Sequence, residues 1–252
     1  MESALATIAR TPRLLVVSDY DGTLAELATD AYKVHTHPGA HQALTRLAHL
    51  PETHVAILSG RHLDGLRQVA DFGDEILFAG SHGAESDIND FELTPEQEAV
   101  LAAITAEFEA IAAPVPGAFV EHKPYHRVLH TIRVADEQQA LDIYEQGQRI
   151  TTPGASITAG KRIVEASPLQ ITKGTWIDVA RAHVQATGVV FVGDDLTDED
   201  GFAVLGAGDV SVKVGAGATQ AQFRVPDVAA AGELFATLAR LRDSATRVET
   251  DV

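Results

Sequence analysis

Two carboxylates separated by a single residue, Asp19 and Asp21, follow the apolar run of residues 14–17 after one serine. Two carboxylates near one point can hold a divalent cation, or they can divide into a nucleophile and a proton donor because neighbouring like charges push their pKa values apart. Gly22 comes next, and glycine adopts backbone conformations that other residues resist. An isolated Asp-Gly pair is more typical of a plain turn, so a prediction of chemistry depends on the rest of the chain.

Polar groups follow two further apolar runs. Residues 55–58 lead into Ser59-Gly60-Arg61, and residues 189–192 lead into Gly193-Asp194-Asp195. Since the carboxyl ends of parallel strands meet at one edge of a sheet, where ligands bind, these groups are expected to lie together. The alternative for Ser59 is a serine in a turn that ends the strand.

Lys173 follows Thr172 at the expected start of a helix. Backbone N–H groups and the helix dipole favour an anion at such a position. A solvated lysine in the first helical turn is the alternative interpretation. The position of Lys173 in the chain, before Asp194, favours a role in binding an anion.

The spacing of apolar residues predicts the elements that position these groups. Strand-length runs alternate with helical patterns at both ends of the chain, which predicts an α/β fold with a Rossmann-like doubly wound parallel sheet. The predicted strands are residues 14–17, 55–58, 76–79, 189–192 and 210–214, and the predicted helices are 40–48, 63–69, 172–186 and 229–241. His183 lies on the apolar stripe of the helix 172–186 and is expected in the core.

The middle of the chain breaks this rhythm. A helix at 94–112, a hairpin at 118–134, a helix at 136–148 and a hairpin at 156–165 are expected there. We therefore predict a catalytic core of residues 12–85 and 168–245 and an inserted α+β cap of residues 86–167. The predicted tails are a loosely held lead-in at residues 1–11 and a polar segment at 246–252.

Composition narrows the class of protein. The chain has 252 residues, a formal net charge of −17 and no cysteine. The charge argues against binding nucleic acid or an anionic membrane surface, and an anionic substrate would need a metal or local cations. Disulfides and thiolate metal sites are excluded. No segment has the length of a membrane span and the start lacks a signal-peptide core, so a cytoplasmic protein acting on a small molecule is expected.

Four separated stretches resemble, in the same chain order, the four motifs of the haloacid dehalogenase superfamily. They are Asp19-Tyr20-Asp21-Gly22-Thr23, Ser59, Lys173 and Gly193-Asp194-Asp195. The inserted unit lies between the second and third motifs, as in members with a C2-type cap. Two longer stretches, Gly80-Ser81-His82-Gly83-Ala84-Glu85 and residues 193–200, are similar to trehalose-6-phosphate phosphatases.

The resemblance implies a Mg²⁺-dependent hydrolase of trehalose biosynthesis that forms an aspartyl-phosphate intermediate. It implies that Asp19 is the nucleophile and that Asp21 is the general acid and then the general base. It implies phosphate binding by Ser59, Gly60 and Lys173, and Mg²⁺ binding by Asp19, Asp194 and the carbonyl of Asp21. Asp195 and Asp198 could orient the metal ligands, although a solvated acidic helix start is the alternative for residues 198–200.

The inserted unit is expected to select the substrate. Strand alternation places Glu121 and Lys123 on one face of the first hairpin, and Lys161 and Glu165 on one face of the last strand. Carboxylates and ammonium groups suit sugar hydroxyls, and the resemblance implies that Glu121, Lys123 and Glu165 contact the sugar. A solvated charged face is the alternative. The family pattern His-Tyr-Arg is replaced here by His130-Thr131-Ile132-Arg133, which leaves the sugar contacts at this position open.

Two other functions remain open. One is a phosphatase for another sugar or osmolyte phosphate, such as sucrose phosphate, mannosyl-3-phosphoglycerate or a glucosyl-glycerol phosphate. The other is a receiver-like phosphoacceptor module, which also combines strand-end aspartates, a lysine and Mg²⁺. Such modules are shorter and have no inserted cap, so the sequence favours the enzyme. The sequence leaves the oligomeric state open.

Overall fold

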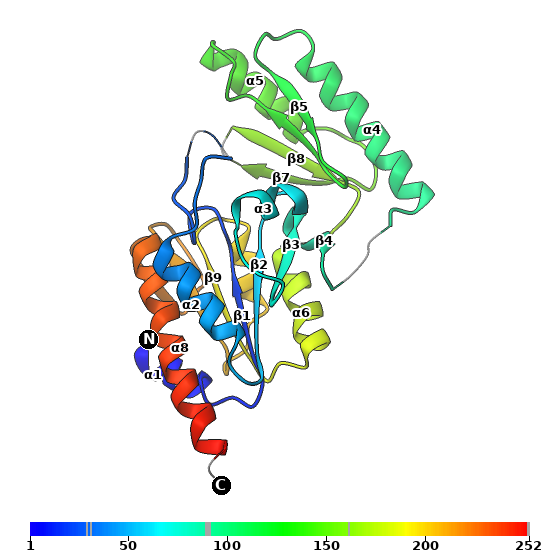
Figure 1. The fold of residues 1–252 in the computed structure, drawn as a ribbon. Helices are drawn as coiled ribbons and strands as arrows, with labels where there is room; N and C mark the ends of the chain where they lie inside the picture. Colours follow the sequence, from blue (N-terminus) through cyan, green and yellow to red (C-terminus); the bar gives the residue numbers. More distant parts are fainter. Residues whose placement is uncertain (29, 31, 89–91, 161, 251–252) are drawn as a thin grey trace. The chain divides into compact units, whose positions relative to one another are not determined.

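The computed structural model of the chain describes residues 1–28, 30, 32–88, 92–160 and 162–250. The chain divides into two compact units, one formed by Met1–Asp90 with Ile171–Val252 and the other by Phe91–Gln170. Figure 1 labels the elements of both units, and each unit is described by itself below.

The larger unit contains a seven-stranded sheet with the strand order β11-β10-β9-β1-β2-β3-β4. Neighbouring strands are parallel, except β3 and β4, which are antiparallel. The strands are β1 (Leu14–Ser18), β2 (Thr53–Leu58), β3 (Ile76–Gly80), β4 (Glu85–Ser86), β9 (Gly188–Gly193), β10 (Val210–Val214) and β11 (Phe223–Val225). The order runs outward from β1 in both directions, so β1 ends at the topological switch point where ligands bind in such sheets. The predicted doubly wound parallel sheet is confirmed.

Helices cover both faces of this sheet. The helices are α1 (Glu2–Ile8), α2 (Pro38–Ala48), α3 (Leu63–Val69), α6 (Lys173–Val184), α7 (Asp198–Ala203) and α8 (Val228–Thr250), and a 3₁₀ turn spans Ser81–Gly83. Along β1, Leu14 and Val16 pack with α1, α2, α3 and α8, whereas Leu15 and Val17 pack with α6 and α7. A strand buried on both faces has a continuous run of apolar residues, so β1 could be predicted from the sequence.

The two ends of the chain differ from the sequence expectation. Residues 1–11 were expected to be a loosely held lead-in, but Leu5 and Ile8 of α1 are buried in the core. A seven-residue helix without a side-chain cap leaves little signal in a sequence. At the other end, α8 continues to Thr250 and includes most of the predicted tail. The prediction that His183 is in the core was also wrong, because its side chain is exposed on α6.

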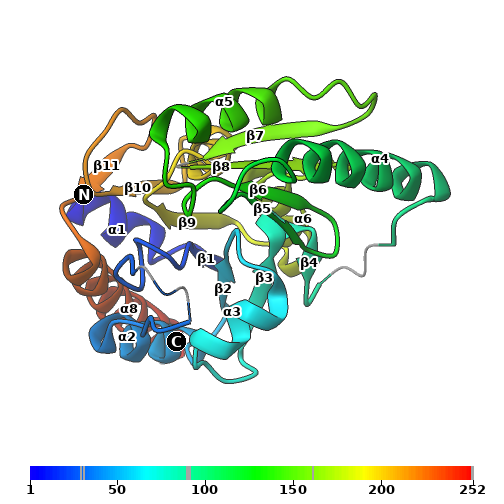
Figure 2. The same ribbon diagram turned by 90° about the horizontal axis from the view of Figure 1, so that it is seen from above.

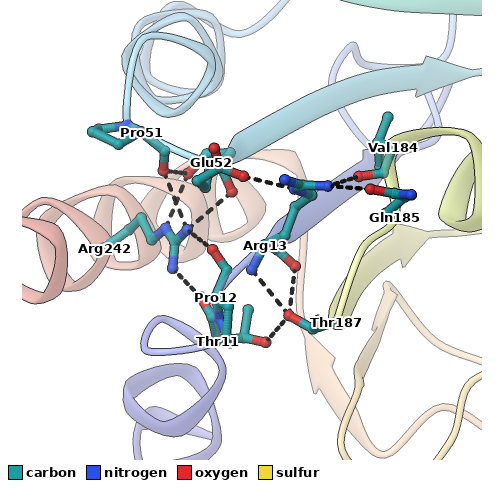
Figure 3. Close-up of polar contacts among 10 residues, drawn as sticks. Thr11, Pro12, Arg13, Pro51, Glu52, Val184, Gln185, Thr187 and Arg242 are labelled. Atoms are coloured by element: carbon teal, nitrogen blue, oxygen red, sulfur yellow. Dashed lines mark hydrogen bonds and ion pairs between the residues drawn. The ribbon is translucent and has the colours of Figure 1, made fainter.

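A buried arginine ties several segments together at the edge where the parallel strands begin (Figure 3). Arg242 of α8 is only 2% exposed. Its guanidinium donates to the hydroxyl of Thr53 at 2.9 Å and to five backbone carbonyls, those of Ala9, Thr11, Pro12, Pro51 and Glu52. Arg13 continues the network on the surface, where it donates to the Glu52 carboxylate at 2.6 Å and to Gln185 at 2.9 Å. Arg242 thus connects α8 to the segments that lead into β1 and β2.

The smaller unit contains an antiparallel four-stranded sheet with the order β5-β6-β8-β7. Its elements are α4 (Pro95–Ala112), β5 (Phe119–His122), β6 (Arg127–His130), α5 (Glu137–Gln148), β7 (Ser156–Gly160) and β8 (Ile163–Ser167). Thr94 and Asp136 cap the two helices through their side chains. This order of helix, hairpin, helix and hairpin agrees with the pattern in the sequence.

One face of the four-stranded sheet packs against its helices (Figure 2). Leu129 and Val164 are paired across β6 and β8 and are buried with side chains of α4 and α5. Glu121, Val128 and Glu165 are paired in a row across β5, β6 and β8. Residues directly opposite each other share a face, so these three lie on the face that points away from α4 and α5.

Within the part of the chain that the structure describes, no helix combines the length and the apolar composition that crossing a bilayer requires.

Candidate active site

The candidate site is a cluster of carboxylates where β1 and β9 end. Asp19 directly follows β1, and its backbone N–H donates to the carbonyl of Val192 in β9 at 2.9 Å. Carboxylate oxygens of Asp19, Asp194 and Asp198 all lie within 4.8 Å of one another. Asp19 is 4% exposed and Asp198 is fully buried. Parallel strands at the switch point therefore bring together residues that are far apart in the sequence.

Lys173 neutralises part of this cluster. It is the first residue of α6, whose start is fixed by a capping box between Thr172 and Thr175. Its Nζ donates to a carboxylate oxygen of Asp19 and to one of Asp198, both at 2.7 Å. Because Lys173 is only 2% exposed, the interpretation as a solvated first-turn lysine was wrong.

The charges in this buried cluster shift each other's pKa values. Burial raises the pKa of Asp19 well above its ordinary value of 3.8; Lys173 opposes this shift, and the charges of Asp198 and Asp194 add to it. Burial also raises the pKa of Asp194 to about 6, again with a contribution from Asp198. Burial alone would lower the pKa of Lys173, but Asp19 and Asp198 raise it above its ordinary value. Among the described residues, Lys173 is the one ion-pair partner of these three carboxylates, so they leave a negative site that a cation would complete.

The loop after β9 is ordered by Asp198. Its carboxylate accepts hydrogen bonds from the backbone N–H groups of Asp194 and Asp195, each at 2.9 Å. The alternative of a solvated acidic helix start is therefore wrong for Asp198, although it is the first residue of α7. The Asp194 carboxylate also lies 3.5 Å from the hydroxyl of Thr23.

Two glycines leave room for these carboxylates. Gly22 has a φ of +80°, and a Cβ atom there would lie 2.2 Å from an oxygen of Asp194. A Cβ atom on Gly193 would lie 2.2 Å from the carboxyl carbon of Asp198. Cβ atoms do not tolerate such distances. The acidic groups thus occupy space that any other residue type at positions 22 and 193 would fill.

Asp21 has a different environment from Asp19. Its two carboxylate oxygens accept hydrogen bonds from Nε and Nη2 of Arg61, each at 2.6 Å. This bidentate geometry is the strong form of a carboxylate-guanidinium pair. Arg61 in turn lies over the ring of Tyr20 at 5.7 Å. The side chain of Asp21 is thus held by Arg61. Arg61 belongs to the stretch Ser59-Gly60-Arg61, but the sequence did not predict that it pairs with Asp21.

Ser59 and Gly60 lie where β2 ends. Ser59 is 1% exposed, and its hydroxyl accepts from the backbone N–H of Arg61 at 3.1 Å. Its own backbone N–H donates to Ala79 at 2.9 Å. That N–H is used in the sheet, so it is the hydroxyl of Ser59 that could contact a phosphate. Phosphate binding by the Ser59 hydroxyl and by Gly60 stays a prediction.

The predicted sugar-binding residues belong to the smaller unit. Lys123 donates to the Glu165 carboxylate at 3.1 Å, and His130 lies 2.9 Å from the Glu121 carboxylate. The bond with His130 lowers the pKa of Glu121 despite partial burial. Glu121, Lys123 and Glu165 thus belong to one cluster of polar side chains in the smaller unit, while Lys161 lies outside the described residues. Their contact with a sugar stays a prediction.

The segment that departs from the family pattern has a defined local structure. Thr131 is buried and donates through both its N–H and its hydroxyl to the carbonyl of Arg162. Ile132 is 57% exposed. The Arg133 guanidinium lies 4.8 Å from the centre of the Phe119 ring, on which the His130 ring also stacks at 4.4 Å. The chain therefore turns inward at Thr131, and Arg133 lies against an aromatic ring.

The acidic cluster suits a hard cation. Mg²⁺ prefers oxygen ligands and is often held by one or two carboxylates, and Asp19, Asp194 and Asp198 offer such oxygens within 4.8 Å of one another. The donor set contains no sulfur or imidazole. Asp198 already bonds to Lys173 and to two backbone N–H groups, so Asp19 and Asp194 have more free acceptor capacity. These residues fit the predicted cofactor.

Comparisons with known proteins agree with this site. The family model described as trehalose-phosphatase matches residues 17–229. The chain is 37% identical over 223 residues to trehalose-6-phosphate phosphatase of Escherichia coli K12, covering 83% of this chain and 82% of that one. It is 32% identical over 269 residues to trehalose-phosphate phosphatase of Mycobacterium tuberculosis H37Rv, covering 95% of this chain and 64% of that longer protein.

Solved structures have the same fold. The C-terminal domain of Candida albicans trehalose-6-phosphate phosphatase superposes with a TM-score of 0.79 at 21% identity, covering 94% of this chain and 96% of that one. Aspergillus fumigatus trehalose-6-phosphate phosphatase gives a TM-score of 0.66 at 26% identity, covering 97% of this chain and 98% of that one. Fold, motif order and sequence identity agree, and this chain belongs to the trehalose-phosphatase family of the haloacid dehalogenase superfamily.

Proposed function

We propose that this chain hydrolyses trehalose 6-phosphate to trehalose and phosphate, with Mg²⁺ as cofactor and Asp19 as nucleophile. The observation that carries the proposal is the buried Asp19 carboxylate, bonded to Lys173 beside Asp194 and Asp198. A single carboxylate held by a fixed ammonium at a strand end suits attack on phosphorus. The names of the relatives supply the substrate.

In the first half of the reaction, a carboxylate oxygen of Asp19 forms a bond to phosphorus while the bond from phosphorus to the sugar oxygen breaks. Asp21 donates a proton to that oxygen, since a sugar alkoxide is a poor leaving group. Lys173 offsets the charge on the phosphoryl oxygens. The products of this half are free trehalose and a phosphorylated Asp19.

In the second half, a water oxygen attacks the phosphorus of the aspartyl phosphate. Asp21 accepts a proton from that water, the bond between Asp19 and phosphorus breaks, and inorganic phosphate leaves. Asp19 is thereby returned to its carboxylate form. Because Arg61 holds both oxygens of Asp21, this pair must open for Asp21 to exchange protons with the substrate and with water.

The cofactor would be held by Asp19, Asp194 and the carbonyl of Asp21. When bound, Mg²⁺ reduces the repulsion between an anionic nucleophile and an anionic phosphate. Asp198 would support the cation site indirectly, because its carboxylate accepts a hydrogen bond from the backbone N–H of Asp194 and so fixes the loop that supplies one ligand. Such supporting bonds commonly orient metal ligands.

The smaller unit would act as the cap and bind the disaccharide. Glu121, Lys123 and Glu165 combine hydrogen-bond acceptors and a donor, as recognition of an uncharged polyol requires. The ion pair between Lys123 and Glu165, together with their low exposure, favours fixed positions for both side chains. Preorganised polar groups bind with a smaller loss of conformational entropy.

A phosphate-release assay over a panel of sugar phosphates, with and without Mg²⁺, tests this function. We expect trehalose 6-phosphate to be the preferred substrate and chelation of Mg²⁺ to abolish turnover. Equal rates with glucose 6-phosphate would contradict the assigned substrate while leaving the phosphatase chemistry intact. Full activity after chelation would contradict the cofactor.

A phosphatase for another glycosyl phosphate is the second candidate. It is favoured by the segment His130-Thr131-Ile132-Arg133, where an exposed isoleucine and an arginine stacked on Phe119 replace the family pattern. The panel should therefore include sucrose phosphate and mannosyl-3-phosphoglycerate. We also propose that the enzyme is cytoplasmic and acts on small molecules, without a nucleic-acid or membrane partner. Cell fractionation would check its location.

A further inference from the structure

Lys213 is a buried lysine that lies next to the acidic cluster and belongs to none of the motifs. It is the fourth residue of β10 and is only 4% exposed. Lysine is rarely buried to this extent unless it is paired. Its Nζ donates to the backbone carbonyl of Asp194, and among the described residues it forms no ion pair with a carboxylate. The protein therefore retains a buried charge whose observed partner is a neutral group.

The sheet register explains how Lys213 reaches this carbonyl. Lys213 is paired with Gly193 across β10 and β9, and Ser211 is paired with Phe191 two residues earlier. Phe191 packs with α6 and α7, so Lys213 lies on the same face as Lys173. Because Gly193 has no side chain, the lysine can extend past the end of β9 to the next residue.

The backbone of Asp194 is consequently held on both sides. Its N–H donates to Asp198 at 2.9 Å, and its carbonyl accepts from Lys213. Asp198 is in turn bonded to Lys173. With both backbone groups fixed, the side chain of Asp194 is the part that remains directed toward Asp19 and the space beside Gly22.

Lys213 differs from a buried cation held by carbonyls alone, because it lies beside three carboxylates. A neutral donor could satisfy the same carbonyl without the desolvation penalty of an ammonium. The negative charge of Asp19, Asp194 and Asp198 offsets part of that penalty for a lysine placed beside them. A lysine is therefore favoured here by the same negative charge that favours a cation.

We propose that Lys213 is a positioning residue for the cation site: by holding the carbonyl of Asp194, it keeps the Asp194 carboxylate turned toward Asp19. The inference rests on the proposed Mg²⁺ site but not on the identity of the sugar phosphate. The competing effect has the opposite sign, because an ammonium near the site also repels Mg²⁺. The direction of the change on removing Lys213 therefore decides between positioning and repulsion.

The test is the affinity of the substrate-free protein for Mg²⁺, measured by titration calorimetry. Replacing Lys213→Met should weaken Mg²⁺ binding about 10-fold, as is usual when a group that orients a metal ligand is lost. Lys213→Arg, which keeps a charged donor, should stay within about 3-fold of the wild-type affinity. The matched control is Lys33→Met, which removes a lysine whose side chain is 81% exposed and should leave the affinity unchanged.

An unchanged or tighter Mg²⁺ affinity in Lys213→Met would overturn the proposal. If that variant does not fold, Lys213→Gln replaces it, and fluorescence of the only tryptophan, Trp176, reports folding. A second measurement separates positioning from general damage: in Lys213→Met the Mg²⁺ concentration for half-maximal activity should rise about 10-fold while kcat at saturating Mg²⁺ stays within about 3-fold. A wild-type protein that does not bind Mg²⁺ would contradict the proposed cofactor instead, and a different preferred sugar phosphate would leave this result unaffected.

Discussion

Two of the cations buried in the larger unit have opposite kinds of partner. Lys173, at the edge where the strands end, is bonded to the carboxylates of Asp19 and Asp198. Arg242, at the edge where the strands begin, is bonded to the Thr53 hydroxyl and to backbone carbonyls of five residues. Both residues are 2% exposed, so the difference lies in what surrounds each charge.

This difference indicates a functional role for Lys173 and a structural role for Arg242. Carboxylates change charge with pH and bind cations, so the surroundings of Lys173 respond to pH and to a ligand. Backbone carbonyls keep the same dipole at every pH, so the groups bonded to Arg242 do not change with pH. An arginine with five donors can join several carbonyls at once, whereas a lysine presents a compact charge to a reacting group. We therefore expect changes at the Lys173 edge to affect catalysis and changes at the Arg242 edge to affect stability.

The largest expected effect is on catalysis. Replacing Asp19→Asn should lower kcat by a factor of about 10⁴ or more, because an amide cannot form the aspartyl phosphate. Thermal unfolding should stay cooperative, since asparagine has nearly the same volume as aspartate. Phosphate release under saturating trehalose 6-phosphate measures the effect, and retained turnover would contradict the nucleophile assignment.

Lys173→Met should affect both properties. Loss of the ammonium should reduce kcat roughly 10²- to 10³-fold, the range seen when one group that stabilises a transition-state charge is removed. It also leaves Asp19 and Asp198 buried without their cation, which costs about 3 kcal/mol or more of unfolding free energy. Mg²⁺ should restore part of that stability. Chemical denaturation with EDTA and with Mg²⁺ measures this, and identical stabilities would argue against a cation at the cluster.

Arg242→Met should affect stability alone. Several buried carbonyls lose their donor at once, so the free energy of unfolding should fall by roughly 3 kcal/mol. The kcat of the folded protein should match wild type, since Arg242 lies at the edge where the strands begin. A denaturation curve combined with an activity assay below the unfolding range tests both parts, and a reduced kcat with unchanged stability would reverse the comparison.

The smallest expected effect is a pH dependence at the Lys173 edge. The pKa of Asp194 is raised by burial from 3.8 to about 6, so between these values the folded protein retains a proton that the unfolded chain releases. Raising the pH through this window should therefore lower the melting temperature of the protein in EDTA. Asp194→Asn should reduce the decline, and Asp178→Asn, on the exposed side of α6, should not. A decline of the same size in Asp194→Asn would exclude Asp194 as its cause.

Much of the fold could be predicted because its signals are local. The run Leu14–Val17 is apolar throughout since β1 is covered on both faces, and Thr94 and Thr172 mark helix starts. α1 was missed because its short apolar pattern has no cap. His183 was misassigned because helical spacing indicates a face but does not show where the covering sheet ends.

The site was predictable where motif order carried the information, as for Asp19, Lys173 and Asp194. Contacts that depend on tertiary structure were not. The pairing of Asp21 with Arg61 joins two loops, and the burial of Asp198 depends on Lys173 from another helix. Lys213 had one weak signal, a charged residue in an otherwise buried strand.

The contacts of Gly22 and Gly193 also constrain how this sequence can change over generations. Each glycine leaves the volume that one carboxylate of the cluster fills, Asp194 in one case and Asp198 in the other. A missense change in either codon adds at least a methyl group. That group displaces the acidic side chain of a different residue, Asp194 or Asp198. The two glycines and the two aspartates are therefore expected to be inherited as a set, with purifying selection acting on the glycines as strongly as on the acids.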